Sequence, residues 1–376
     1  MRDNQRNNRL VFSHILSLIS FHMPKFRNKN MNGKYGKTNN GELKIQLKGC
    51  EIMFSIRTDL AVEAKEIYEK QNSADISGVE VDERTEGEIK ITSVKIVNDI
   101  GEKMMRKPKG TYITIDMPRF THYDADTMDE VSRVLGESLS NMVKLDDSMT
   151  ALVVGLGNWN ITPDALGPKV ISKLMVTRHL KQLIPDQIDE DIRPVCAIAP
   201  GVLGLTGIET GEIIKGVVDK IKPNLIICID ALASRKIERV NSTIQVGNTG
   251  ISPGSGVGNR RMELSEQTLG IPVIAIGVPT VVDAATMAND TIDMVLDQMV
   301  KQAEKGGEFY NMLKSLGKEE KYAMIKEILD PYVGNLMVTP KEVDLVIDSV
   351  SKVIANGINI ALQPALDLED INRFLT

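Results

Sequence analysis

The sequence predicts an α/β fold, in which a mainly parallel, twisted sheet is covered by helices on both faces. Short apolar runs of strand length alternate with longer segments of helical periodicity through the second half of the chain. These runs are apolar throughout, which is typical of strands buried on both faces of a parallel sheet. The composition, 42% hydrophobic and 26% charged over 376 residues, gives ample material for a large core.

The part of the chain before residue 150 predicts a helix, a stretch of extended chain and a second helix. The first helix is expected at 62–71, and residues 126–145 carry apolar side chains at helical spacing. Between them, residues 72–120 alternate in strand fashion. The link 105–110 is expected to be a surface turn, because it is charged and contains proline and glycine.

Regular alternation of strands and helices begins at residue 151. Strands are expected at 151–155, 195–199, 225–229 and 271–276. Helices are expected at 168–183, 211–221, 288–304, 318–329 and 340–356. Three of these helices carry start signals, namely Pro168 in the first turn, Thr210 as N-cap, and Thr339 opening a capping box.

The first 52 residues differ in composition from the rest of the chain. They hold ten Lys and Arg against three Asp and Glu, and they lack a sustained apolar pattern. The apolar run Leu10–Met23 is too short to span a bilayer, and no small-residue cleavage site follows it. We therefore interpret residues 1–52 as a disordered leader produced by a start codon assigned too far upstream, with Met53 or a neighbour as the true start. No other segment is predicted to cross a membrane.

Charge and cysteine content limit the partners and the compartment. Beyond residue 52 the chain holds 35 basic and 48 acidic residues, and such an acidic body argues against nucleic acid as a direct ligand. Cys50, Cys196 and Cys228 are too few and too scattered for a disulfide framework or a zinc motif. This usage fits a reducing, intracellular setting.

Two aspartates follow neighbouring strands of the predicted sheet. Asp164 lies in the loop after strand 151–155, and Asp230 directly follows the apolar run 225–229. Ligands of such sheets bind at the carboxyl ends of the strands, so we expect the two carboxylates to converge there. Paired carboxylates shift each other's pKa and can activate water and protonate a leaving amine, or hold a divalent metal. For Asp164 alone, capping of the next helix is an equally good interpretation.

Other catalytic schemes have little support. Gly155 and Gly157 suggest a dinucleotide loop, but Asn160 stands where the third glycine would be, so a tight turn close to a ligand is the better interpretation. The sequence contains neither a G-x-S-x-G elbow nor an H-E-x-x-H motif. The glycine loop around Ser255 is expected to act as a backbone clamp or lid. Trp159 is expected either to contact substrate or to plug the loop that contains it.

Several of these segments together resemble one family. They are Arg57–Ala64, Gly155–Lys169, Pro200–Val202 with Thr206–Thr210, Ile229–Leu232, Pro253–Asn259 and Gly270–Gly277. In this order they resemble the germination proteases of spore-forming Firmicutes, over residues 54–365.

The resemblance implies an endopeptidase of the forespore and spore core, and hence the cytoplasm, that initiates degradation of small acid-soluble DNA-binding spore proteins. It implies a homotetramer without a cofactor or bound metal, made as a zymogen that removes its own propeptide. The family's catalytic aspartates fall on Asp164 and Asp230, and the self-cleavage point falls between Asp59 and Leu60. Residues 53–59 would then be the rest of the propeptide, and 60–376 a single peptidase domain. The implied fold resembles that of the hydrogenase maturation proteases, in which the matching positions bind nickel.

These expectations combine into one mechanistic hypothesis. Asp164 and Asp230 share a proton and activate water, while backbone N–H groups near Gly157, Asn158 and Gly256 stabilise the oxyanion. Two alternatives stay open, a nickel-binding maturation-type protease and a non-catalytic binder of spore proteins.

Overall fold

The computed structural model describes residues 36–37, 43–44, 58–72, 76–118, 124–254, 261–302 and 336–375. The chain divides into two units, Met1–Phe54 and Ser55–Thr376. In the first unit the described residues form an antiparallel pair, β1 (Gly36–Lys37) and β2 (Leu43–Lys44). The predictions of a leader at 1–52 and of a helix at 318–329 fall largely or wholly outside the described residues.

The second unit is built on a nine-stranded sheet with the order β3-β4-β5-β9-β10-β8-β6-β7, with β11 paired to β10. Its strands are β3 (Val79–Glu86), β4 (Ile89–Ile96), β5 (Gly110–Asp116), β6 (Ala151–Gly155), β7 (Val195–Ile198), β8 (Leu225–Ser234), β9 (Thr243–Gly247), β10 (Val273–Asp283) and β11 (Met337–Val338).

The sheet is mixed, so the prediction of a mainly parallel sheet is wrong in this respect. Strands β10, β8, β6 and β7 are parallel, whereas β3, β4, β5, β9 and β11 are joined by antiparallel pairings. The physical reason is clearest at β3 and β4, which only Gly87 and Glu88 connect. Such a short turn can return the chain only beside itself, and Gly87 has the positive φ of 56° that tight hairpins use.

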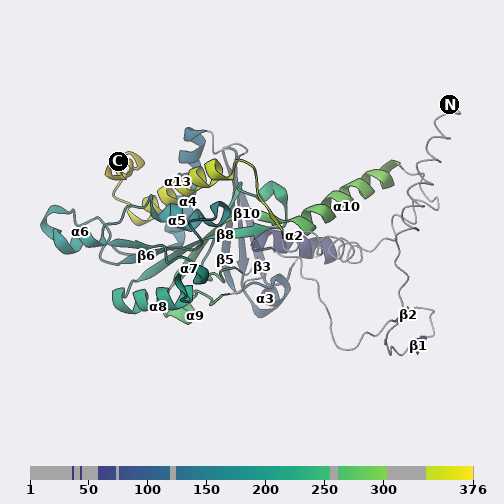
Figure 1. The fold of residues 1–376 in the computed structure, drawn as a ribbon, viewed down its shortest axis with the longest axis horizontal. Coiled ribbons are helices and arrows are strands. Elements are labelled where there is room, and N and C mark those ends of the chain that lie inside the picture. Colours follow the sequence, from purple (N-terminus) through teal and green to yellow (C-terminus); the bar gives the residue numbers. More distant parts are fainter. Residues whose placement is uncertain are drawn as a thin grey trace. The chain divides into compact units, whose positions relative to one another are not determined.

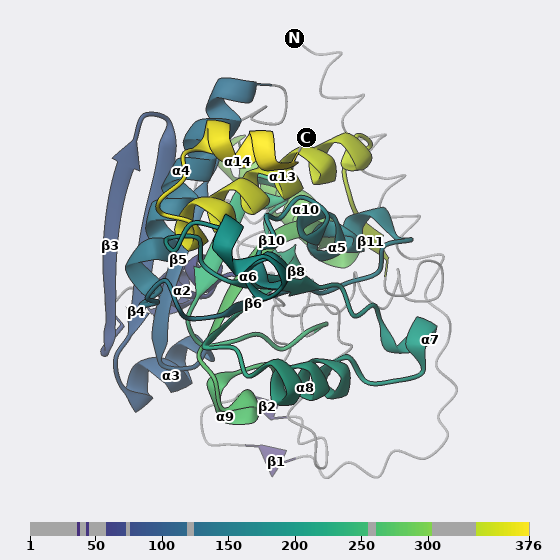
Figure 2. The ribbon, with the colours of Figure 1, turned by 90° about the vertical axis from the view of Figure 1, so that its left-hand side faces the viewer.

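Helices cover both faces of the sheet, as the sequence predicts (Figures 1 and 2). One face carries α4 (Ala125–Met142), α5 (Leu166–Ile171) and α13 (Val343–Leu362), and the other carries α8 (Thr210–Ile221). The remaining described helices are α2 (Ala61–Asn72), α3 (Asp99–Met105), α6 (Arg178–Leu183), α7 (Leu203–Thr206), α9 (Glu266–Leu269), α10 (Ala284–Gln302) and α14 (Leu368–Leu375).

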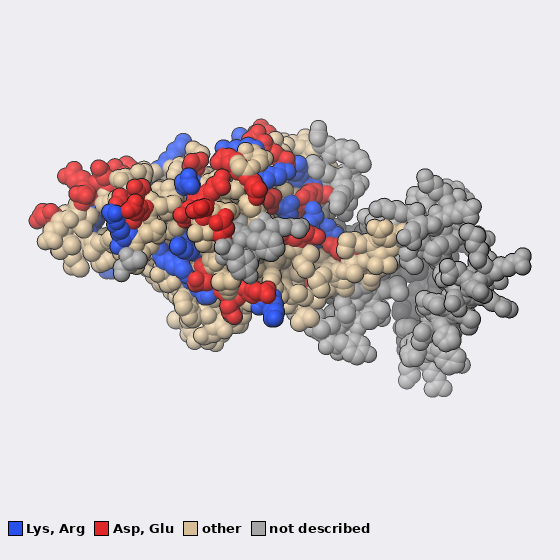
Figure 3. Space-filling model, turned by 90° about the horizontal axis from the view of Figure 1, so that it is seen from above, with Lys and Arg blue, Asp and Glu red and all other residues tan. Residues whose placement is uncertain are grey.

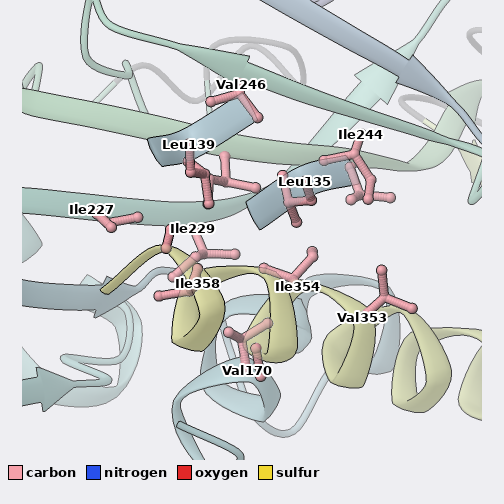
Figure 4. Packing of buried hydrophobic residues seen from close by; sticks show 14 of the residues in the cluster. Leu135, Leu139, Val170, Ile227, Ile229, Ile244, Val246, Val353, Ile354 and Ile358 are labelled. Atoms are coloured by element: carbon pink, nitrogen blue, oxygen red, sulfur yellow. The ribbon is translucent and has the colours of Figure 1, made fainter. Parts of the chain in front are cut away.

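Alternate residues of β8 pack into the two hydrophobic clusters, one on each face of the sheet. Ile227 and Ile229 pack against α13 and α4, whereas Ile226 and Cys228 face the cluster beneath α8 (Figure 4). Helix α13 is long and apolar enough to cross a membrane, but 72% of that apolar stretch is buried inside the domain. Its apolar character therefore reflects a core helix packed on the sheet.

Several predicted boundaries are wrong. The helix expected at 168–183 breaks into α5 and α6, and α5 begins at Leu166, two residues before Pro168 in its first turn. Thr210 and Thr339 do not cap their helices, because Glu209 and Glu342 hold the N-cap positions. Strands β8 and β10 continue past the predicted ends at 229 and 276, and β9 is not foreseen at all.

The surface seen in Figure 3 carries Asp and Glu side chains interspersed with Lys and Arg. Over the described part of this face, no continuous basic stripe is formed. This pattern agrees with the acidic composition of the chain beyond its first 52 residues.

Candidate active site

Asp230 is a buried carboxylate in the middle of β8. The strand runs four residues past it, to Ser234, so Asp230 does not end the strand as the sequence suggests. Its side chain is 6% exposed, and Oδ1 accepts a hydrogen bond of 2.9 Å from the N–H of Ala231. Burial raises the pKa of Asp230 well above its usual value, and the charges of Asp164 and Asp59 raise it further. Burial and the two neighbouring charges therefore favour the protonated form of Asp230.

Asp164 lies at the end of a short 3₁₀ turn, η2 (Thr162–Asp164), just before α5. Its Oδ2 accepts a hydrogen bond of 2.8 Å from the N–H of Asn158, and no side chain caps α5. Asp164 therefore makes no capping hydrogen bond to α5, although it directly precedes Ala165, the N-cap of that helix. Burial raises the pKa of Asp164, and the Asn158 hydrogen bond opposes that rise. Its charge in turn raises the pKa of Asp230, so the two carboxyls form an electrostatically coupled pair.

Gly157 lets the loop after β6 fold back tightly onto Asp164. Its φ is +111°, and a Cβ placed on it would lie 2.0 Å from the carbonyl oxygen of Asp164. Only glycine fits such a close approach of two backbones. The glycine predicted to make a tight turn thus positions one carboxyl of the pair.

A segment of the chain itself lies beside this pair. Strand β6 ends at Gly155, and just after it the N–H of Leu156 donates to Ile229 O of β8 at 2.8 Å. Four residues further along β8, Ala233 bonds to Asp59 instead. The Asp59 N–H donates to Ala233 O at 3.2 Å, and the Ala233 N–H donates to Asp59 Oδ2 at 3.0 Å. One backbone bond and one side-chain bond thus hold Asp59 against the last part of β8.

The side chain of Leu60 fills a small apolar cluster. It is fully buried and packs with Val62, Leu232 and Ile251. Leu232 is two residues after Asp230 in the same strand, so both side chains point to the same face of the sheet. The residue after Asp59 is thus held by its side chain on the face that carries Asp230.

The carbonyl oxygen of Asp59 accepts two side-chain hydrogen bonds. Lys107 Nζ donates at 2.8 Å and Gln245 Nε2 at 3.1 Å, while Gln245 Oε1 accepts the N–H of Ala61 at 2.6 Å. Burial lowers the pKa of Lys107, and the charges of Asp59 and Glu63 oppose this shift. The turn 105–110 was predicted to be a plain surface turn, but its Lys107 side chain contacts the Asp59 carbonyl.

Glu63 fixes the start of α2 to the loop after β8. It is 1% exposed, and it accepts hydrogen bonds from the N–H groups of Arg235 at 2.8 Å and Lys236 at 3.0 Å. The hydroxyl of Thr58 also donates to it, and Arg239 Nε lies 3.7 Å away. These contacts anchor the chain on both sides of the Asp59–Leu60 bond.

The other predicted site residues have different fates. Asn158 lies in the loop with Gly157, but its N–H is directed to Asp164. Gly256 lies outside the described residues. Trp159 is 56% exposed, so it does not plug the loop. Lys107 and Gln245 were missed, and no local signal marks them, since each acts only through the tertiary fold.

A metal site needs several ligands in one place. Among the residues that the structure describes, no three His, Cys, Asp or Glu side chains group as a metal site would require. The nickel-binding alternative therefore has no ligand set within that part of the chain.

An α/β domain with two coupled carboxyls beside a firmly held backbone segment has the features of a peptide hydrolase. Residues 57–311 and 297–375 match the family model of the germination proteases, Peptidase A25. A germination protease of Clostridium tetani is 68% identical over 321 residues, which cover 85% of this chain and 99% of the relative. Those of Clostridium acetobutylicum and Bacillus cereus are 64% and 44% identical, over 86% and 85% of this chain and 100% and 97% of the relatives. The chain belongs to the germination protease family and is an endopeptidase, which confirms the resemblance drawn from the sequence.

Proposed function

We propose that this endopeptidase is a zymogen that cleaves itself between Asp59 and Leu60 and then degrades small acid-soluble spore proteins during germination. In this proposal Asp164 and Asp230 are the catalytic pair, residues 53–59 are the rest of the propeptide, and residues 60–376 form one peptidase domain. The family membership supports the proposed substrates, and the setting that goes with them is the cytoplasm of the forespore and the spore core.

One observation carries the proposed cleavage point. Asp59 is hydrogen-bonded to Ala233 of β8, the strand that holds Asp230, and its charge raises the pKa of Asp230. The chain on either side is anchored, with Leu60 in the apolar cluster and Glu63 against the loop after β8. A bond held this firmly next to two coupled carboxyls is positioned as a substrate would be.

The environments of the two carboxyls suggest separate roles. Asp230 is the more buried and feels two neighbouring negative charges, so it carries the shared proton and donates it to the leaving amine. Asp164 accepts an N–H from Asn158, which favours its ionised form, so it activates the water. Gly157 and Asn158 then act by positioning Asp164. An oxyanion contact from Gly256 stays a prediction.

The partners follow from the same proposal. The proposed substrates are the small acid-soluble proteins that coat spore DNA, whereas the acidic composition beyond residue 52 disfavours direct binding of nucleic acid. The assembly expected from the family is a homotetramer, and neither a membrane nor a cofactor takes part in the proposed reaction.

Mass spectrometry of the purified full chain tests the proposal. Wild type and the variants Asp164→Asn and Asp230→Asn are incubated side by side, with Asp186→Asn as the control, because Asp186 is exposed in a distant turn. We expect a new N-terminus at Leu60 in wild type and in the control only. The same processing in Asp230→Asn would overturn the proposed pair. Added spore proteins that are bound but left uncut by every sample would favour the non-catalytic binder.

A further inference from the structure

We propose that Lys107 and Gln245 bind and polarise the carbonyl group of the bond that is cut. This inference rests on the proposed cleavage between Asp59 and Leu60. It assigns a catalytic task to two residues outside the aspartate pair, one in the turn between α3 and β5 and the other in β9.

Both acceptor positions of the Asp59 carbonyl oxygen are filled by side-chain donors. The distances of 2.8 Å from Lys107 and 3.1 Å from Gln245 lie in the range expected of donors that stabilise an oxyanion. Backbone segments that merely pack against a domain are held mostly by backbone partners and side-chain burial. Here a charged donor and an amide donor, from elements far apart in the sequence, meet on one oxygen.

Gln245 grips the backbone on both sides of the bond. Its Nε2 donates to the Asp59 carbonyl and its Oε1 accepts the N–H of Ala61 at 2.6 Å. The N–H and C=O groups at these positions exist in any peptide, so the grip does not depend on side chains. A substrate lying along the same path would be held in the same way.

The charge of Lys107 is placed where it has most effect. The ammonium lies far enough inside for burial to lower its pKa, and Asp59 and Glu63 favour its charged form. It also lies 5.8 Å from the ring centre of Tyr112, which favours a cation. A cation partly withdrawn from water stabilises developing negative charge more strongly than an exposed one.

The proposed step is an ordinary hydrolysis. Water forms the new C–O bond at the Asp59 carbonyl carbon and gives one proton to Asp164, while the carbonyl electron pair moves to the oxygen held by Lys107 and Gln245. The pair then returns, the C–N bond to Leu60 breaks, and the proton on Asp230 goes to the leaving amine. The products are a carboxyl group on Asp59 and an amine on Leu60.

Self-cleavage of full-length variants tests this assignment. Lys107→Met removes the charged donor at nearly constant volume, and Gln245→Glu keeps the acceptor for Ala61 but removes the donor to Asp59. Loss of one such donor lowers catalysis by about 100- to 1,000-fold, so we expect first-order cleavage rates to fall by about that factor. Lys107→Arg restores a cationic donor and should recover part of the loss. Lys109→Met is the matched control, because Lys109 is exposed in the same turn and pairs with Asp99.

Hydrogen exchange at the Asp59 and Ala61 amides separates catalysis from anchoring. We expect protection of both amides to stay near wild type in Lys107→Met, which removes the donor without placing a new charge beside the Asp59 carbonyl. A wild-type cleavage rate in Lys107→Met would overturn the inference, and so would a rate loss matched by an equal loss of protection, which would make Lys107 an anchor. Asp230→Asn is measured alongside. If it is inactive while Lys107→Met cleaves normally, only this inference fails, whereas cleavage in Asp230→Asn would refute the proposed function itself.

Discussion

Replacing Gly157 with alanine should displace Asp164 and stop self-cleavage. The added methyl carbon would lie 2.0 Å from the carbonyl oxygen of Asp164 and 3.3 Å from its Oδ1. The first contact is far inside van der Waals range and involves backbone, which cannot rotate away. The φ of +111° adds backbone strain of about 1–3 kcal/mol for any residue with a Cβ. Core overpacking costs about 1–3 kcal/mol in addition to this strain, so we expect an unfolding free energy lower by about 2–6 kcal/mol.

The effect on catalysis should exceed the effect on stability. A misplacement of about 1 Å in a catalytic group can lower a rate about 100-fold, and the shift needed to relieve this contact is at least that large. Urea unfolding and the rate of appearance of the Leu60 N-terminus measure the two effects. Gly216→Ala is the control, because a Cβ there meets nothing within 4 Å, and alanine favours its helix α8. Wild-type cleavage and stability in Gly157→Ala would refute the steric argument.

Three further changes test other parts of the reasoning. The pKa of Asp230 is raised on folding, so above about pH 4 the folded chain binds more protons than the unfolded chain, and the folded state loses stability as the pH rises toward the raised pKa. Asp230→Asn removes this penalty, so the variant should resist urea unfolding better than wild type at about pH 7. This advantage should fade below about pH 4, where Asp230 of the unfolded wild type is protonated as well. Glu63→Gln sets an amide NH₂ against backbone donors, and it should lower the local unfolding free energy of α2, followed by hydrogen exchange, by about 1–3 kcal/mol. Buried Arg193 donates to carbonyls at the end of α13 and in the loop after α4, so Arg193→Met should lower the unfolding free energy by about 3 kcal/mol, whereas exposed Arg373→Met should change it by less than about 0.5 kcal/mol.

Local patterns in the sequence were sufficient to predict strands of the parallel half of the sheet. Strands β6, β7 and β8 are nearly continuous apolar runs because both of their faces are covered, and that pattern is visible without the structure. The strands of the antiparallel half are harder to predict from the sequence. Strand β9 has only five residues and includes Gln245, and its place between β5 and β10 is set by partners far away in the chain. Pairing of this kind leaves little trace in a single sequence.

The candidate site divides in the same way. Asp230 could be predicted because it directly follows an apolar run, where a carboxyl is costly unless it has a partner, and Asp164 because it lies in the loop after the neighbouring strand. Lys107 could not, since it lies in a charged turn with the composition of ordinary surface. Its hydrogen bond to the Asp59 carbonyl depends on where the fold places the turn between α3 and β5. No spacing of residues in the sequence predicts that contact.

In the proposed mechanism, the contacts of the Asp59–Leu60 segment suit a propeptide and a separate protein chain alike. Lys107, Gln245 and Ala233 hold this segment largely through N–H and C=O groups that any peptide backbone offers. The turn at Gly157 holds Asp164 in place, and the charge of Asp164 acts on Asp230. Specificity must then come from the neighbouring side-chain contacts, the apolar cluster around Leu60 and the donors around Glu63.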